Sequence, residues 1–150
     1  MIAYHQAETR FPRFNLGKAR VGAFGVGIYF YLKKPENAHY AFCDVKLQNP
    51  IKKGERKISP EKWEEWKHQV ELIVEEESGE KISLPILDGT DIQNHKWLCD
   101  IYAGNVDRPN WENFLSQFVS ICGCDGYFEE GENGFAMSFC PEKVAIICWF

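Results

Sequence analysis

Short apolar stretches alternate with turn signals over the first third of the chain and predict a series of short strands. Residues 2–5, 24–30 and 42–47 have the length and apolar content of strands. The second stretch is apolar at nearly every position, which predicts that both faces of this strand are buried. Pro35 opens the stretch 35–41, and since proline is common in the first turn of a helix, we expect a short helix there.

Two longer helices are predicted further along the chain. Ser59 is suited to cap the first helix, and Pro60 fits its first helical position. A stripe of apolar residues follows at helical spacing: Trp63, Trp66, Val70 and Ile73 or Val74. A second helix is expected over about 108–122, with Gly123 as its natural end. Residues 80–106 contain several turn signals and are ambiguous.

The last part of the chain returns to strands. Residues 126–139 predict two strands joined by a turn rich in glycine and asparagine. Many short strands with few helices favour an α+β fold, built on a split antiparallel β-sheet with a few flanking helices. A chain of 150 residues suits a single domain, 1–150.

Composition narrows the function classes. The net charge of -5 argues against a protein that coats nucleic acid. The six cysteines contain no Cys-x-x-Cys pair, so we expect reduced thiols in a cytoplasmic protein and no zinc or other metal site. The N-terminus shows no signal-peptide pattern, and the longest apolar run, 144–150, is too short to span a bilayer. We therefore expect no membrane association.

One motif suggests chemistry. The sequence Gly-Val-Gly-Ile-Tyr-Phe at 25–30 places Tyr29 on an apolar strand, Tyr40 follows eleven residues later, and His5 lies upstream in another short strand. In this order the motif resembles the NAD-binding core of the ADP-ribosyltransferase superfamily, in the histidine-tyrosine-glutamate branch that includes the poly(ADP-ribose) polymerases. The resemblance covers roughly residues 3–48 and 120–146, so residues 51–110 are expected to be an insertion specific to this chain's group.

The resemblance implies roles in binding NAD. His5 would hydrogen-bond a ribose hydroxyl on the adenosine side. Tyr29 and Tyr40 would stack on the two faces of the nicotinamide. The backbone of Gln6 would contact the nicotinamide amide, although many relatives have glycine at this position. The remaining expected NAD-binding residues are Gly27 in the glycine-flanked strand, Asn37 where relatives often have serine, and the diphosphate candidates Arg10, Arg13 and Arg20.

The expected catalytic acid is one of three glutamates. Relatives often place glutamate at the start of the last core strand, where this chain has Phe135. Small phage relatives place the acid in a turn before a glycine, which favours Glu132, with Glu130 second and Glu129 third. A carboxylate there would stabilise the oxocarbenium-like ribose as nicotinamide leaves. The alternative interpretation is a solvated acidic turn.

The resemblance therefore implies an NAD-dependent mono-ADP-ribosyltransferase that modifies a macromolecular acceptor, more readily a protein than a nucleic acid. Small phage and bacterial effectors, including anti-defence factors such as some anti-CRISPR proteins, are the most similar group. Two alternatives stay open: an NAD glycohydrolase, in which water replaces the acceptor, and a catalytically inactive binding module.

Overall fold

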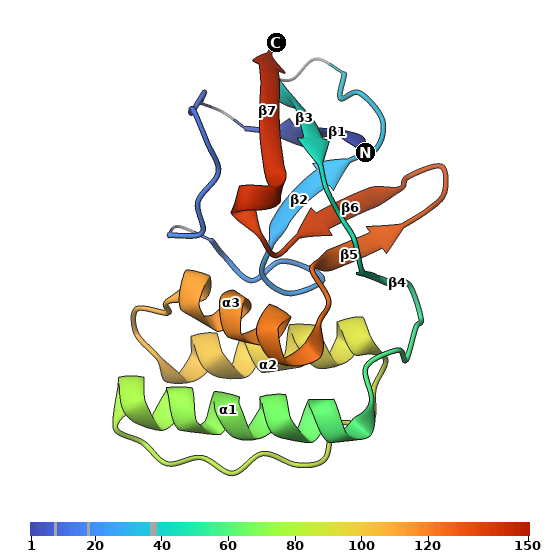
Figure 1. Ribbon diagram of the computed structural model, residues 1–150. Coiled ribbons are helices and arrows are strands. Elements are labelled where there is room, and N and C mark those ends of the chain that lie inside the picture. The colour runs from blue at the N-terminus through green and yellow to red at the C-terminus, as the bar shows by residue number, and fades with distance from the viewer. Residues whose placement is uncertain (8, 18, 37–38) are drawn as a thin grey trace.

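The computed structural model describes residues 1–7, 9–17, 19–36 and 39–150, and in these residues it combines one seven-stranded sheet with three α-helices (Figure 1). The predicted α+β class is confirmed. The strands are β1 (Ile2–Gln6), β2 (Ile28–Tyr31), β3 (Tyr40–Val45), β4 (Pro50–Lys52), β5 (Gly126–Glu129), β6 (Phe135–Ser138) and β7 (Val144–Trp149). The helices are α1 (Pro60–Ser78), α2 (Asp91–Asn105) and α3 (Trp111–Cys122), and the short 3-10 helix η1 (Pro141–Lys143) precedes β7.

The strand order is β4-β5-β6-β2-β1-β3-β7, so β1 lies between β2 and β3. The neighbouring strands are antiparallel except for β4 and β5, which are parallel. The sheet is therefore one mixed sheet rather than the split antiparallel sheet that we expected. Parallel neighbours need a long crossover connection, and the three helices between β4 and β5 supply it. β7 forms one edge, and its register against β3 shifts between Phe42 and Cys43.

The predicted first helix is confirmed, and its ends follow from the sequence. The side chain of Ser59 accepts a hydrogen bond from the N–H of Lys62, and Pro60 is the first helical residue. Gly79 ends α1 in the left-handed conformation, with φ of 77°. The second predicted helix is also present as α3, which begins at Trp111 rather than at 108 because Asn110 caps it.

α2 occupies the stretch that the sequence left ambiguous. Thr90 and Gln93 form a reciprocal capping box at its start. The buried positions 91, 94, 95, 98, 99 and 102 recur at helical spacing on one face, but this face carries the polar residues Asp91, Asn94 and His95. The helix therefore lacks the one-sided apolar stripe by which an amphipathic helix is recognised in a sequence.

Two local predictions between β1 and β3 are wrong. Residues 24–27 form a turn, so β2 begins only at Ile28. The helix expected at 35–41 is not found in the described residues of that stretch, and Tyr40 begins β3 instead. The reason is long-range pairing: Tyr40 pairs with Gln6 in β1, and it exchanges backbone hydrogen bonds of 3.4 and 3.0 Å with Phe150.

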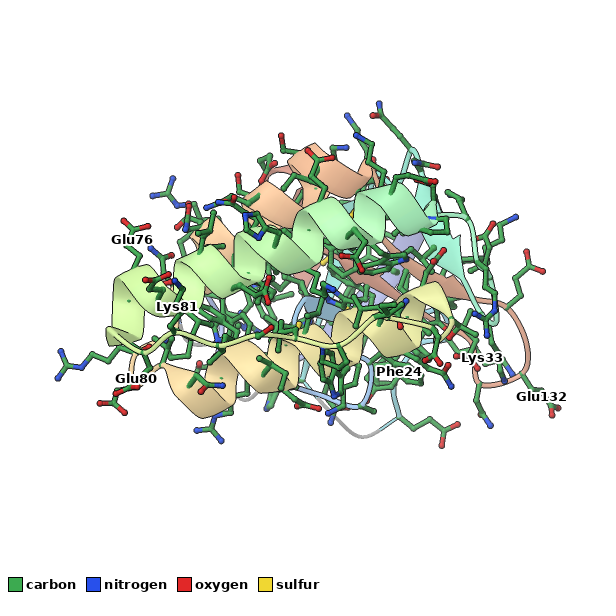
Figure 2. The ribbon with its side chains drawn as sticks, turned by 90° about the horizontal axis from the view of Figure 1, so that it is seen from below. Phe24, Lys33, Glu76, Glu80, Lys81 and Glu132 are labelled. Carbon is green, nitrogen blue, oxygen red and sulfur yellow. The ribbon has the colours of Figure 1, made fainter. Side chains whose placement is uncertain are left out.

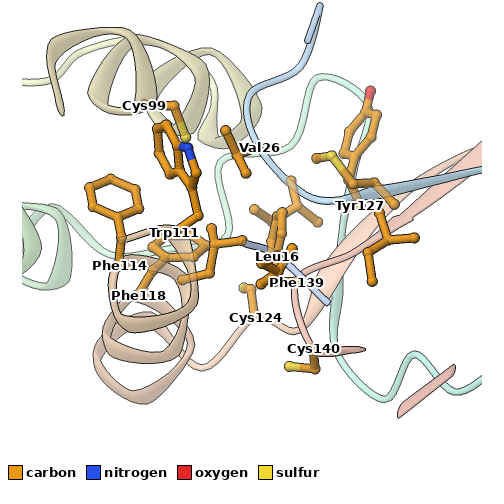
Figure 3. Packing of buried hydrophobic residues seen from close by; sticks show 14 of the residues in the cluster. Leu16, Val26, Cys99, Trp111, Phe114, Phe118, Cys124, Tyr127, Phe139 and Cys140 are labelled. Carbon is orange, nitrogen blue, oxygen red and sulfur yellow. The ribbon is translucent and has the colours of Figure 1, made fainter. Parts of the chain in front are cut away.

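The helices lie at one end of the sheet, with α1 farthest from it and with α2 and α3 between α1 and the strands (Figure 1). The core that joins the two layers is aromatic. Phe118 of α3 approaches Phe139 with a ring-centroid distance of 5.4 Å, and both belong to the buried cluster in Figure 3. Among the described residues, no helix has both the length and the apolar character needed to cross a bilayer.

Asp125 ties three separate segments together. Its Oδ2 accepts hydrogen bonds from the N–H of Gln48 at 2.7 Å and from Lys143 Nζ at 3.0 Å, and its Oδ1 accepts one from the N–H of Asn49 at 3.0 Å. Burial opposes ionisation of this carboxyl group, but the hydrogen bonds from Gln48, Lys143 and Asn49 outweigh it and hold its pKa below the usual value. The ionised form therefore stabilises the connection between β3 and β4 and the start of β5.

Replacing Asp125 by Asn should lower the free energy of unfolding at neutral pH by about 1–3 kcal/mol, because an NH2 group would face a donor that the carboxylate now satisfies. Since the pKa of Asp125 is lowered by folding, its contribution is complete above the ordinary pKa of about 4 and is lost as the pH falls below that value. Chemical denaturation at neutral and acidic pH measures both effects. Asp44→Asn is the control, because the Asp44 side chain is 41% exposed and, among the described residues, its ion pair is with the N-terminal amine. Equal losses in the two variants would contradict the proposed role of Asp125.

Candidate functional site

A cleft of about 480 Å3 opens where β1 and β2 end and the β5–β6 turn passes them. We call it the Gln6–Glu132 cleft, after two predicted site residues that it brings together. Lys33 and Glu132 lie at the same end of the molecule, as Figure 2 shows. The lining residues are Gln6, Tyr31, Lys33, Pro35, Glu36, Glu132, Asn133 and Gly134.

Gly134 holds the acidic turn against β2. Its carbonyl oxygen accepts a hydrogen bond from the N–H of Leu32 at 3.3 Å, and its own N–H donates to Gly131 O at 3.1 Å. A Cβ atom at position 134 would lie 2.8 Å from Glu129 O and 2.9 Å from Leu32 Cδ1. Only glycine fits this approach without displacement, so the backbone that carries Glu132 is fixed relative to β2.

The structure distinguishes the three candidate acids. Glu132 lines the cleft, whereas Glu130 is exposed and is not part of its lining. Glu129 is already engaged: its carboxylate lies 3.4 Å from Lys53 Nζ and accepts a hydrogen bond from the Tyr127 hydroxyl at 3.3 Å. Of the three acids, Glu132 is therefore the one that lines the cleft, and it takes part in neither of the contacts described for Glu129.

The two predicted nicotinamide tyrosines share a face of the sheet with Gln6. Tyr4 pairs with Tyr31 across β1 and β2, and Gln6 pairs with Tyr40 across β1 and β3. Because side chains alternate along a strand, Tyr29, Gln6 and Tyr40 point to the same face. Since β1 separates β2 from β3, the two tyrosines start roughly 10 Å apart, which is two strand spacings, with Gln6 between them.

Each tyrosine nevertheless packs on its own phenylalanine, so the expected two-walled slot is not formed in this structure. The ring of Tyr29 stacks on Phe135 at a centroid distance of 6.3 Å. The ring of Tyr40 stacks on Phe150 at 5.2 Å, with Lys34 Nζ 5.9 Å from its centroid. Both rings therefore have an aromatic neighbour other than each other.

His5 points to the opposite face of the sheet from Gln6 and does not line the cleft. Its Nδ1 lies 2.7 Å from Tyr29 O, so the ring donates Nδ1–H to this carbonyl oxygen and bridges β1 and β2. The ring contacts Phe14 at a centroid distance of 4.7 Å and Phe30 at 5.8 Å. Burial lowers the pKa of His5, and the hydrogen bond to Tyr29 opposes this shift only in part.

The predicted diphosphate residues lie away from the cleft. Arg10 and Arg20 are exposed, and Arg13 lines a different cavity of about 800 Å3 between the N-terminal loop, α3 and η1. Gly27 packs against β6, where a Cβ atom would lie 2.5 Å from Met137 Cγ. Asn37 lies outside the residues that the structure describes.

Among the lining residues that the sequence analysis did not predict, three carry reactive or aromatic side chains: Tyr31, Lys33 and Glu36. All three lie between the end of the Gly-Ile-Tyr-Phe motif at Phe30 and residue 36, so the motif was the local sequence feature that could have identified them. Their position depends on the pairing of Tyr31 with Phe135, which brings the end of β2 beside the acidic turn. Lys33 adds a cation to a lining that also holds the carboxylates of Glu36 and Glu132.

Replacing Gly134 by Ala should destabilise the protein by about 1–3 kcal/mol, because the added methyl group meets the backbone of Glu129 as well as Leu32. Thermal unfolding measures this loss. Gly104→Ala is the matched control: its Cβ position on α2 is open, so alanine should stabilise the helix by about 0.5–1 kcal/mol. A neutral or stabilising Gly134→Ala would show that the turn is not held as described.

Comparisons of the chain with protein-family models, with curated proteins and with solved structures found no match in any of the three. The resemblance to ADP-ribosyltransferases therefore rests on the residues quoted from the sequence alone.

Proposed function

We propose that this protein is an NAD-dependent mono-ADP-ribosyltransferase whose reaction takes place in the Gln6–Glu132 cleft. One observation carries the proposal. Gln6, which follows the motif histidine, and Glu132, in the turn before Gly134, are far apart in the sequence. Both nevertheless line the same cleft beside β2, the strand of the motif. In the ADP-ribosyltransferase pattern these are the segments that contact nicotinamide and the ribose next to it.

The nicotinamide is placed over β1, between Tyr29 and Tyr40. A stacked ring needs about 3.5 Å on each side, and the roughly 10 Å between the two strands leaves room for it once Gln6 moves aside. Gln6 is exposed, so its side chain is free to turn away. Tyr40 is buried between Phe150, Tyr4 and Lys34, so Lys34 also has to move before this ring presents a face to the ligand.

The reaction follows from the charges in the cleft. The bond between ribose C1′ and the nicotinamide nitrogen breaks, and its electron pair neutralises the departing pyridinium. The ribose becomes oxocarbenium-like, and the Glu132 carboxylate stabilises this developing positive charge. The acceptor nucleophile then bonds to C1′ and loses its proton. Lys33 lines the cleft and is the cation that would bind the diphosphate, in place of the three arginines.

The fold assignment is part of the same proposal. We infer an ADP-ribosyltransferase-like core formed by β1–β3 and β5–β7, with α1 and α2 belonging to an insertion at 51–110. His5 then acts on the site through the backbone, because its hydrogen bond to Tyr29 O fixes β1 against β2. The acceptor that we propose is a protein, because exposed acids at Glu36 and Glu132 rim the cleft and would repel a nucleic acid.

Replacing Glu132 by Gln should reduce nicotinamide release from NAD by about 10²–10³-fold, because the charge that stabilises the transition state is removed while the shape is kept. NAD affinity, measured by isothermal titration calorimetry, should change little. Glu130→Gln is the control and should keep nearly full activity, since Glu130 lies outside the lining of the cleft.

The assay is run with labelled NAD, with and without cell lysate, so that a labelled protein band reports transfer and free ADP-ribose reports hydrolysis. Full activity in Glu132→Gln with loss in Glu130→Gln would move the catalytic role to Glu130. NAD binding without nicotinamide release in the unsubstituted protein would instead identify a binding module.

Replacing Gln6 by Gly should lower the dissociation constant for NAD by about 3- to 10-fold, because the ligand no longer has to order a side chain that fills its place. Gln6→Leu is the control at the same position, since it keeps the bulk and should bind no better than the parent. Isothermal titration calorimetry compares the three proteins. Unchanged binding in Gln6→Gly would show that nicotinamide does not lie over β1.

A further inference from the structure

The residues before β2 form a turn, 22–27, that we call the glycine turn. Gly22 and Gly25 exchange backbone hydrogen bonds of 3.1 and 3.2 Å across it. The hydroxyl of Tyr29 donates to Gly25 O at 2.7 Å and accepts from the N–H of Phe24 at 3.2 Å. Tyr29 thus folds back onto the glycine turn, and the orientation of its ring depends on where the turn lies.

His95 of α2 holds the glycine turn from the other side. Its side chain is fully buried, and its Nε2 lies 3.2 Å from Val26 O, so Nε2 carries the proton and donates it. Gly25 has a φ of 92°, and a Cβ atom there would lie 2.6 Å from His95 Cδ2. The imidazole therefore makes a polar contact with Val26 and leaves no space for a side chain at Gly25.

The surroundings of His95 keep its ring neutral and in one orientation. Phe118 and Phe139 lie at ring-centroid distances of 4.9 and 4.6 Å. The titratable group that faces the ring is Cys99, whose Sγ lies 3.6 Å from Nε2 and whose pKa burial raises to about 12. Burial lowers the pKa of His95 to about 4, against the opposing hydrogen bond to Val26. Its Nδ1 has no hydrogen-bond partner among the described residues, so Nε2–H makes its hydrogen bond to the turn.

We propose that His95 is a positioning residue: from the helical layer it fixes the glycine turn and, through the turn, the orientation of Tyr29. That Tyr29 contacts NAD rests on the proposed function, whereas the contact by which His95 fixes the glycine turn does not. On this inference α2, which belongs to the expected insertion, sets the orientation of a ring proposed to stack on nicotinamide, although neither α2 nor Tyr29 lines the Gln6–Glu132 cleft.

Amide hydrogen exchange followed by NMR tests the hold on the turn in the full-length protein. His95→Leu fills the space but cannot donate, so exchange at Phe24 and Gly25 should accelerate by about 10-fold or more while exchange in β1 and β3 changes little. His95→Gln offers an N–H to Val26 O and should restore most of the protection. Phe114→Leu, in the core between α2 and α3, is the control for general destabilisation and should affect the whole chain evenly.

Equal acceleration at all amides in His95→Leu, as in Phe114→Leu, would reduce His95 to an ordinary core residue and overturn the proposal. So would a His95→Gln variant that exchanges like His95→Leu. If His95→Leu fails to fold, ring nitrogen chemical shifts of the parent decide: a proton on Nε2 at neutral pH supports the hydrogen bond to Val26, and a proton on Nδ1 contradicts it.

Steady-state kinetics with NAD separate this proposal from the proposed function. If both hold, His95→Leu should raise the KM for NAD several-fold and leave kcat within about 3-fold, because it displaces a binding wall and not the acid. A parent protein that neither binds nor cleaves NAD would end the proposed function, and the exchange measurements would still decide the role of His95. A lower kcat with unchanged KM would contradict the positioning role at the Tyr29 wall.

Discussion

The close approach of the β5–β6 hairpin to β2 is the constraint on which the rest of the structure depends. At both Gly27 and Gly134 a side chain would collide with the neighbouring strand or turn. Because glycine lets the backbones meet, β2 pairs with β6 over its whole length, from Ile28 to Tyr31. The cleft forms at one end of this contact, and the glycine turn precedes it at the other. The positions of the cleft and of the glycine turn therefore both depend on the pairing of β2 with β6.

Gly25 and Gly27 of the motif are required by packing, independently of the resemblance to NAD-binding proteins. Gly25 lies against His95 and Gly27 against Met137, so the packing alone requires glycine at both positions. Asp125 and Gly126 also have structural reasons, namely backbone hydrogen bonds to Asp125 and the close passage of Met137 O beside Gly126. A motif of this kind identifies a strand that must be packed closely, and the residues around it decide whether that strand also binds a nucleotide.

Features that depend on neighbouring residues were predictable from the sequence, and features that depend on distant pairing were not. α1 was predictable because its cap, its proline and its tryptophan stripe all lie within the helix. α2 was not, because its buried face includes the polar residues Asp91, Asn94 and His95, so no apolar stripe marks it in the sequence. Tyr40 looked helical from its neighbours, but pairing with Gln6 placed it in β3. In the site, the turn sequence pointed to Glu132, whereas Lys33 enters the cleft only through the register of β2 and β6.

β7 closes the far side of the sheet with six residues, none of them charged, and Ile147 on this strand is 53% exposed. An apolar strand with free backbone groups is the kind of edge on which further strands assemble. The register shift between Phe42 and Cys43 interrupts the regular spacing of those groups, and such irregularities increase the local twist of a strand. The shift leaves Ile147 unpaired between Ile146 and Cys148, so a second molecule that pairs along β7 would meet an interrupted ladder of hydrogen bonds. This irregularity works against fibril growth in concentrated solution, although the strand itself carries no charge to prevent it.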